Sequence, residues 1–173
     1  MHKLHLHPGS TAGPVESISA SISPTASGCR VQFRLHGELQ QVRIADLADS
    51  ERADNLWKTT CFEAFWQPQG DTAYREFNFS PSTRWAAYDF DDFRENGRDA
   101  PVDAIAVACA HSNEALLLTA DIAADLPLPA MVALNAIVED SKGVLHYWAL
   151  SFRDGPPDFH SIETRSLRLE DLR

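Results

Sequence analysis

The sequence lacks the features that mark disulfide-rich, metal-binding, nucleic-acid-binding or membrane-spanning proteins. It has only three cysteines, and the spacing of Cys29, Cys61 and Cys109 matches no metal-binding pattern. An odd number of cysteines does not build a disulfide framework, so we expect reduced and mostly buried thiols. Acidic residues outnumber lysine and arginine by 25 to 15, which argues against nucleic acid and anionic membranes as partners.

Long apolar runs are also missing. No stretch approaches the roughly 20 apolar residues of a membrane span, and residues 1–10 hold no apolar signal-peptide core. We therefore expect a cytoplasmic protein. The sequence contains no phosphate-binding loop, no nucleophile elbow and no metal-ligand spacing, so we expect neither a metal nor another cofactor.

Short runs in which apolar and polar residues alternate are present along most of the chain. This period of two is typical of half-buried β-strands, and turn signals separate the runs. No long amphipathic helix interrupts them. The pattern predicts an all-β protein, an antiparallel β-sandwich of about ten or eleven strands, as one ligand-binding domain over residues 1–173.

Several segments of this sandwich are predicted individually. Residues 2–8 have the pattern of a first strand, a candidate edge strand, and residues 38–45 that of a short strand. The charged tail from Ser161 is expected to run along the outside. The expected hairpins span residues 16–36, 102–123 and 131–152.

Residues 57–93 hold three of the four tryptophans and form the centre of the functional interpretation. Each predicted strand there has an apolar core face and a second face that mixes acids and amides with aromatic rings. If the strands are neighbours, this face suits a sugar, because indole stacks on its C–H groups and carboxylates or amides bind its hydroxyls. The alternative is a half-buried sheet whose polar side chains cross-link strands. The residues assigned to this face are Glu63, Glu76, Asn78, Ser80, Trp85, Asn135, His146 and Trp148.

Several segments also resemble a known group of proteins. LWKTTCFEAF, YREFNFSPSTRWAAYDFDDF, HYWALSF and PDFH, in this order, resemble the bacterial DOMON-like domain proteins. That superfamily includes DOMON domains and carbohydrate-binding module family 9, so the resemblance implies a β-sandwich of jelly-roll type that binds a ligand. Trp57, followed six residues later by Glu63, is similar to the family 9 pair that stacks on and hydrogen-bonds a terminal sugar. Trp85 and Trp148 are candidates for the second aromatic wall.

We therefore expect a non-catalytic protein that binds a small ligand, a sugar or sugar derivative, between tryptophans and carboxylate or amide groups. Lys58 and His160 are placed at the rim of this site. The predicted ligand-binding residues are Trp57, Lys58, Glu63, Glu76, Asn78, Trp85, Asn135, His146, Trp148 and His160.

Alternative functions remain open at this point. One is a hydrolase or lyase that uses Glu63 and Glu76 with either His146 or His160. Another is a protein-interaction module or homodimer that buries its tryptophans against a partner.

The superfamily also admits bound ions or heme. The DOMON resemblance allows a heme binder, in which Met131 would pair with His146 or His160. Some sandwich relatives bind calcium, for which carboxylate oxygens are suitable ligands. The carboxylates available for calcium are those of Asp89, Asp91 and Asp92.

Overall fold

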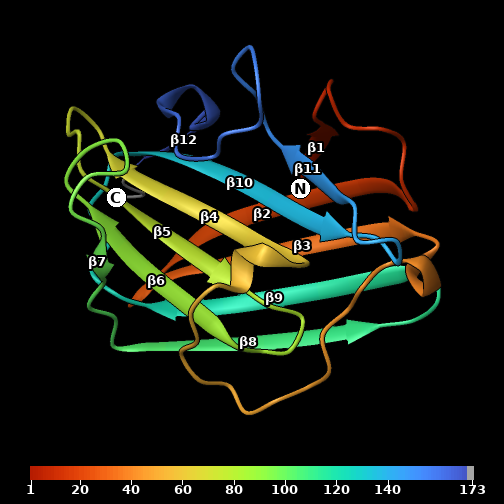
Figure 1. Cartoon of the computed structure of the whole chain (residues 1–173). Helices are drawn as coiled ribbons and strands as arrows, with labels where there is room; N and C mark the ends of the chain where they lie inside the picture. The colour runs from red at the N-terminus through yellow and green to blue at the C-terminus, as the bar shows by residue number, and fades with distance from the viewer. Residues whose placement is uncertain (171–173) are drawn as a thin grey trace.

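The computed structural model describes residues 1–170 and consists almost entirely of β-strands (Figure 1). The strands are β1 (His2–Leu6), β2 (Val15–Thr25), β3 (Gly28–Gly37), β4 (Cys61–Pro68), β5 (Tyr74–Phe79), β6 (Trp85–Phe90), β7 (Arg98–Asp99), β8 (Ala104–His111), β9 (Ala115–Ala123), β10 (Ala130–Glu139), β11 (Leu145–Ala149) and β12 (Leu167–Leu169). The 3-10 helices are η1 (Leu39–Gln41), η2 (Leu56–Lys58) and η3 (Ile162–Thr164). Within residues 1–170, no helix has the length and apolarity that a membrane span requires.

The strands form two packed layers. The front sheet has the order β7-β6-β5-β4-β10-β11, with β12 beside the first half of β10, and the back sheet has the order β2-β3-β9-β8. β1 pairs with β11 on one side and with β2 on the other, so it joins the two sheets. All pairings between these strands are antiparallel. The predicted antiparallel β-sandwich is therefore confirmed, with twelve strands in the described residues.

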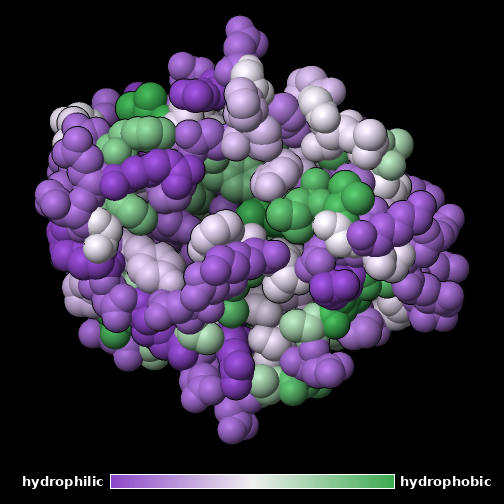
Figure 2. All heavy atoms as spheres, in the orientation of Figure 1, coloured by the Kyte–Doolittle hydropathy of each residue, from purple (hydrophilic) through white to green (hydrophobic). Residues whose placement is uncertain are grey.

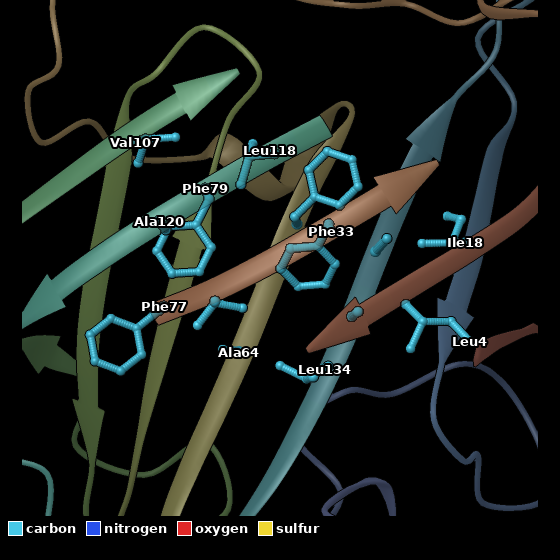
Figure 3. Packing of buried hydrophobic residues seen from close by; sticks show 14 of the residues in the cluster. Leu4, Ile18, Phe33, Ala64, Phe77, Phe79, Val107, Leu118, Ala120 and Leu134 are labelled. Carbon is cyan, nitrogen blue, oxygen red and sulfur yellow. The ribbon is translucent and has the colours of Figure 1, made fainter. Parts of the chain in front are cut away.

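The main core lies between the two sheets, where the inward faces of the alternating strands meet (Figure 3). Phe33 and Leu118 point inward from the back sheet, and Phe77, Phe79 and Leu134 from the front sheet. The rings of Phe33 and Phe62 meet across the interface with their centroids 5.0 Å apart. Because one side chain in two enters this layer, the period of two seen in the sequence follows directly from the packing.

The outer face of the front sheet is buried as well, which a simple sandwich does not require. β4 is buried along seven successive residues, and nearly all of β10 is buried. A second apolar cluster explains this burial, because Phe159 of the C-terminal segment packs over Phe65 and Ile137. This covered outer face is where the candidate site forms.

Three predictions about individual segments are wrong. β1 is not an edge strand, since it is paired on both sides. Residues 38–45 form the 3-10 turn η1 with Leu39 buried, and Val42 makes only an isolated bridge to Asp140. The described part of the tail from Ser161 does not run along the outside. Arg165 is buried, and β12 pairs with β10 and packs its leucines against the main core.

Replacing Phe62 with alanine is expected to lower the free energy of unfolding by about 3–5 kcal/mol, because a fully buried ring leaves a cavity against Phe33. Chemical denaturation measures this change. Ser21→Ala, at a half-buried position of β2, is the control and should stay within about 0.5 kcal/mol of the wild type. A Phe62 variant as stable as the control would contradict the core described above.

Candidate functional site

A pocket of about 570 Å³ opens on the outer face of the front sheet. Figure 2 views this side of the molecule and shows pale and green side chains gathered near the middle, with purple hydrophilic residues around them. The apolar lining consists of Trp57, Phe65, Tyr88, Phe90, Gly97, Ile137, Tyr147, Pro157 and Phe159. The polar lining consists of Glu63, Glu76, Arg94, Asp158 and His160.

A row of polar side chains crosses the floor beneath this pocket. Glu63 of β4 stands directly opposite Asn78 of β5 on one side and Asn135 of β10 on the other. All three side chains are buried. Because directly opposite residues on neighbouring strands point to the same face, the register alone places an amide, a carboxyl and an amide side by side.

The two carboxyl groups of the floor differ in their partners. Asn78 Nδ2 donates a hydrogen bond of 2.8 Å to Glu76 Oε1. Within residues 1–170, the carboxyl of Glu63 has no hydrogen-bond partner, although the side chain is only 3% exposed. Both amide atoms of Asn135 are likewise buried without a partner in the described part of the chain. Glu63 and Asn135 thus leave unused hydrogen-bonding capacity at the bottom of the site.

Burial governs the ionisation of this floor. Desolvation raises the pKa of Glu63 well above its ordinary value, and the nearby charge of Glu76 raises it further. The pKa of Glu76 is also raised by burial, while the hydrogen bond from Asn78 lowers it in part. Arg94 lowers both pKa values, but its side chain is more than half exposed and lies at the rim. The floor therefore holds protons that exposed glutamates would release.

A chain of hydrogen bonds fixes the histidine of the site. The backbone N–H of Arg94 donates to Tyr74 Oη at 3.2 Å, and Tyr74 Oη lies 2.7 Å from His160 Nδ1. Since the tyrosine oxygen already accepts one hydrogen bond, its own proton is directed at Nδ1, which leaves the imidazole proton on Nε2. That nitrogen lies 3.5 Å from Glu76 Oε2. Burial lowers the pKa of His160 to about 4, so the contact to Glu76 is not an ion pair at neutral pH.

Arg165 holds the covering segment against the sheet. Its guanidinium lies 4.2 Å from the centroid of the Tyr74 ring and 5.6 Å from that of Phe65. Its Nη1 donates to the backbone oxygen of His160 at 3.2 Å. Burial lowers the pKa of Arg165, and the positive charge helps to lower that of His160. Arg165 therefore positions Tyr74 and His160 from behind the pocket.

The rim is built from two turns. Trp57, in η2, is 47% exposed, and the ammonium of Lys58 lies 5.6 Å from the centroid of its ring. The following turn is fixed where Thr59 Oγ1 donates to Glu139 Oε2 at 2.6 Å. On another side, Arg94 Nη2 donates to Asp158 Oδ1 at 2.9 Å, which ties the β6–β7 loop to the C-terminal segment.

The structure brings together part of the predicted ligand-binding set. Four of its members line the pocket, namely Trp57, Glu63, Glu76 and His160. Asn78 and Asn135 share the outer face with Glu63 and lie beneath the pocket. Lys58 is exposed beside Trp57, outside the lining. Their role in binding a ligand stays a prediction.

The predicted face of Trp85 is wrong. Trp85 stands opposite Phe79, and Ala87 stands opposite Phe77, so both belong to the core side of β6. Both faces of this strand carry an aromatic residue and an alanine, so composition did not distinguish them. The register with β5 identifies the outer face of β6, because Tyr88 stands opposite Glu76.

The predicted face of His146 and Trp148 is wrong for the same reason. Trp148 stands opposite Ala136 and is buried in the main core. His146 lies on the same side, at the end of the sheet, with Nε2 3.2 Å from Asp140 Oδ2. The alternate residue Tyr147 is the one that lines the pocket.

Sequence reasoning missed most of the aromatic wall. Tyr88, Phe90 and Tyr147 line the pocket because they occupy the faces of β6 and β11 that the sequence assigned to the core. Pairing β6 with β5 in a tight hairpin would have placed Tyr88 and Phe90 correctly. No sequence signal places Phe159, because a loop carries it across the sheet.

The residues suggested for heme or calcium have other environments. Met131 shares the outer face of β10 with Ala133 and Asn135, whereas His146 points to the opposite side, so these two do not form an axial pair. The carboxylate of Asp89 is engaged by Arg75 at 2.6 Å. That of Asp91 is engaged by Arg98 at 2.7 Å. Within residues 1–170, no group of three potential metal-ligating side chains is assembled.

A second hollow, of about 640 Å³, lies elsewhere on the surface. Its lining is Glu16, His36, Gly37, Glu38, Gln40, Gln41, Asn113 and Glu114. No aromatic ring apart from the imidazole faces it. It therefore lacks the combination of apolar walls and buried polar groups that specific small-ligand sites have, and the aromatic pocket is the better candidate.

Comparison with known proteins extends these observations only at the level of fold. No protein-family model and no curated protein matches the chain. Among solved structures, the fold is similar to that of a candidate carbohydrate-binding protein from Bacteroides uniformis, with a TM-score of 0.62 and 16% sequence identity. The alignment covers 84% of this chain and 74% of that one. At this identity the likeness establishes a shared β-sandwich fold.

His160 should titrate with a pKa of about 4, well below the ordinary value of 6.5, because the folded protein buries the imidazole. NMR titration of the imidazole C–H signals measures this value, with the exposed His36 as a reference in the same spectra. As the pH falls, the imidazole takes up its proton at a higher pH in the unfolded chain than in the folded protein. The contribution of His160 to stability is therefore lost as the pH falls from 6.5 towards 4. A midpoint near 6.5 would contradict the buried, neutral imidazole.

The Glu63→Gln variant should become more stable relative to the wild type as the pH rises. A carboxyl with a raised pKa binds more protons in the folded than in the unfolded chain, so its ionisation takes stability away above the ordinary value of 4.5. Glutamine does not ionise. Denaturation of both proteins between about pH 4 and pH 8 measures the difference, which should grow in favour of the variant. The exposed Glu16→Gln is the control, and a difference independent of pH would contradict the assignment.

Proposed function

We propose that this chain acts as one domain that binds a small carbohydrate in the aromatic pocket without transforming it. The observation that carries the proposal is the pocket floor, where the buried carboxyl groups of Glu63 and Glu76 open into a space walled by aromatic rings. Burying an acid is costly unless it is paired, so an incompletely satisfied pair points to a ligand that supplies the missing hydrogen bonds.

A carbohydrate matches both parts of this surface. Its C–H faces pack on aromatic rings such as those of Trp57 and Tyr147, and its hydroxyl groups donate to or accept from the carboxyls of Glu63 and Glu76. The pocket of about 570 Å³ has a volume suited to a small ligand. The similar fold of the candidate carbohydrate-binding protein from Bacteroides uniformis supports the same proposal.

The resemblance to the bacterial DOMON-like proteins is consistent with this function. The segment LWKTTCFEAF contributes the exposed Trp57 and the buried Glu63, and both line one pocket. We further propose that the chain is a member of that group. The second aromatic wall differs from the expectation, because Trp85 and Trp148 face the core and tyrosine and phenylalanine rings take their place.

Binding fits the electrostatics of the site better than hydrolysis or elimination. A general acid–base pair works best when two groups have pKa values driven apart around the working pH. Here the pKa values of Glu63 and Glu76 are both raised by burial. His160, with a pKa of about 4, is a weak base. The arrangement therefore favours hydrogen bonding to a ligand over proton transfer.

Replacing Trp57 should reveal ligand binding directly, because it is the only tryptophan that lines the pocket in the described residues. A carbohydrate that packs on this half-exposed indole is expected to change tryptophan fluorescence and to raise the melting temperature. Trp57→Phe should abolish the fluorescence change. Trp57→Ala should weaken binding by about two- to tenfold, which corresponds to the loss of one aromatic contact.

Trp85→Phe is the matched control, because Trp85 lies on the core face of the same sheet. This variant should keep both the affinity and the fluorescence change. The screen covers monosaccharides, disaccharides, sugar phosphates and uronic acids. If no member of this panel raises the melting temperature, or if Trp57→Ala binds as tightly as the wild type, the proposed function is wrong.

A further inference from the structure

The ionisable groups that face the aromatic pocket are mostly acids. Glu63 and Glu76 lie on its floor, and the acid at its rim, Asp158, is already bound to Arg94 at 2.9 Å. Apart from the Arg94–Asp158 pair, the ionisable side chains of the lining are Glu63, Glu76 and His160. His160 is neutral at neutral pH, so the two that can carry a charge there are both acids. A ligand that enters this space meets two acids that no cation of the lining fully compensates.

The charged groups just outside the pocket do not restore the balance. Arg165 is buried behind Tyr74 and Phe65, with its charge directed at their rings and at a backbone oxygen. Lys58 lies over the outer part of the Trp57 ring at the exposed rim, where solvent screens its charge. Glu139, at the end of β10, is paired with Arg43 at 2.9 Å.

The walls around the two acids are also suited to positive charge. Phe90 of β6, Tyr147 of β11 and Phe159 of the C-terminal segment present aromatic rings to one pocket, whereas the Tyr88 ring already has the Arg52 guanidinium 5.2 Å from its centroid. The face of an aromatic ring attracts a cation, and this attraction is strongest where water is excluded. Carboxyl groups at the floor and aromatic rings at the sides together form the surroundings that bind a substituted ammonium group.

We propose that the ligand carries a protonated amine, held over the carboxyl groups of Glu63 and Glu76. This inference rests on the proposed function and narrows it, because it selects amino sugars with a free amine from among carbohydrates. The ammonium would donate charge-assisted hydrogen bonds to the carboxyl of Glu63, which has no partner within residues 1–170, and to Glu76. A neutral hydroxyl donates only one hydrogen bond and has no positive charge to favour the ionised form of either acid.

Sugars that differ only in the amino group test the preference for a protonated amine, with the full chain as the protein. Isothermal titration calorimetry compares glucose with glucosamine and N-acetylglucosamine, and repeats the comparison in the galactose and mannose series. Within each series the ring is the same, and only the amino sugar is charged. In the series that binds, the amino sugar should bind at least about tenfold more tightly than its parent and its N-acetyl form, the size of one charge-assisted hydrogen bond.

The pH dependence is a second readout. An ammonium lowers the pKa of the carboxyls that it contacts, so binding releases protons and the affinity for the amino sugar should rise between about pH 5 and pH 7. Titrations in buffers with different ionisation enthalpies measure the released protons. The neutral parent sugar should release none. An amino sugar that binds without proton release and with an affinity independent of pH would overturn the inference.

Variants of the two floor acids test whether the preference for an amino sugar depends on them. Glu63→Gln and Glu76→Gln are expected to reduce the amine preference to about twofold or less, because each removes an acid while keeping the side-chain shape. Glu16→Gln, in the second hollow, should keep the full preference and controls for general attraction to an acidic protein. An unchanged preference in both floor variants would overturn the assignment.

The outcomes separate the two proposals. If the neutral sugar of a series binds as well as its amino sugar, carbohydrate binding stands and the amine inference is wrong. If no sugar of any series binds, the proposed function itself fails. The comparison of sugars uses only the wild-type protein, so it decides the question even where a variant does not fold.

Discussion

The burial of two carboxylic acids on the outer face of the front sheet is the constraint on which the rest of the site depends. An acid on an exposed sheet face costs nothing, whereas Glu63 and Glu76 lose most of their hydration. Their burial requires the cover formed by the segment around Phe159 and His160. Arg165 holds that cover, because its guanidinium lies over the Tyr74 and Phe65 rings and donates to the backbone oxygen of His160. The unusual double-sided burial of the central strands follows from this arrangement.

The same constraint explains the neutral histidine. Tyr74 donates towards His160 Nδ1 while it accepts from the Arg94 backbone, so the hydrogen-bond chain satisfies an uncharged imidazole. A charged imidazole would carry a proton on Nδ1, so the hydrogen bond with Tyr74 Oη would have to reverse its direction. The proximity of Arg165 disfavours the charge as well. Arg165 therefore keeps its positive charge outside the pocket lining, while that of Arg94 at the rim is paired with Asp158.

Alternation in the sequence was sufficient to predict the sandwich, most strands and the shared face of Glu63, Glu76, Asn78 and Asn135. It was not sufficient to choose between two similar faces, and so Trp85, His146 and Trp148 were assigned to the wrong side. In β6 and β11 both faces carry aromatic residues, and only the register with neighbouring strands distinguishes them. His160 was placed at the rim, but the path of the covering segment over the sheet was not predicted, because long-range packing rather than periodicity determines it.

The strand shared by the two sheets has a consequence for synthesis on the ribosome. β1 spans His2–Leu6 and is made long before its partner β11, which spans Leu145–Ala149. β4 likewise waits for β10 before its second edge is paired. The nascent chain therefore presents apolar, unpaired strands until β10 and β11 have been translated. A topology with such distant pairings folds slowly and depends on protection from aggregation while it is incomplete.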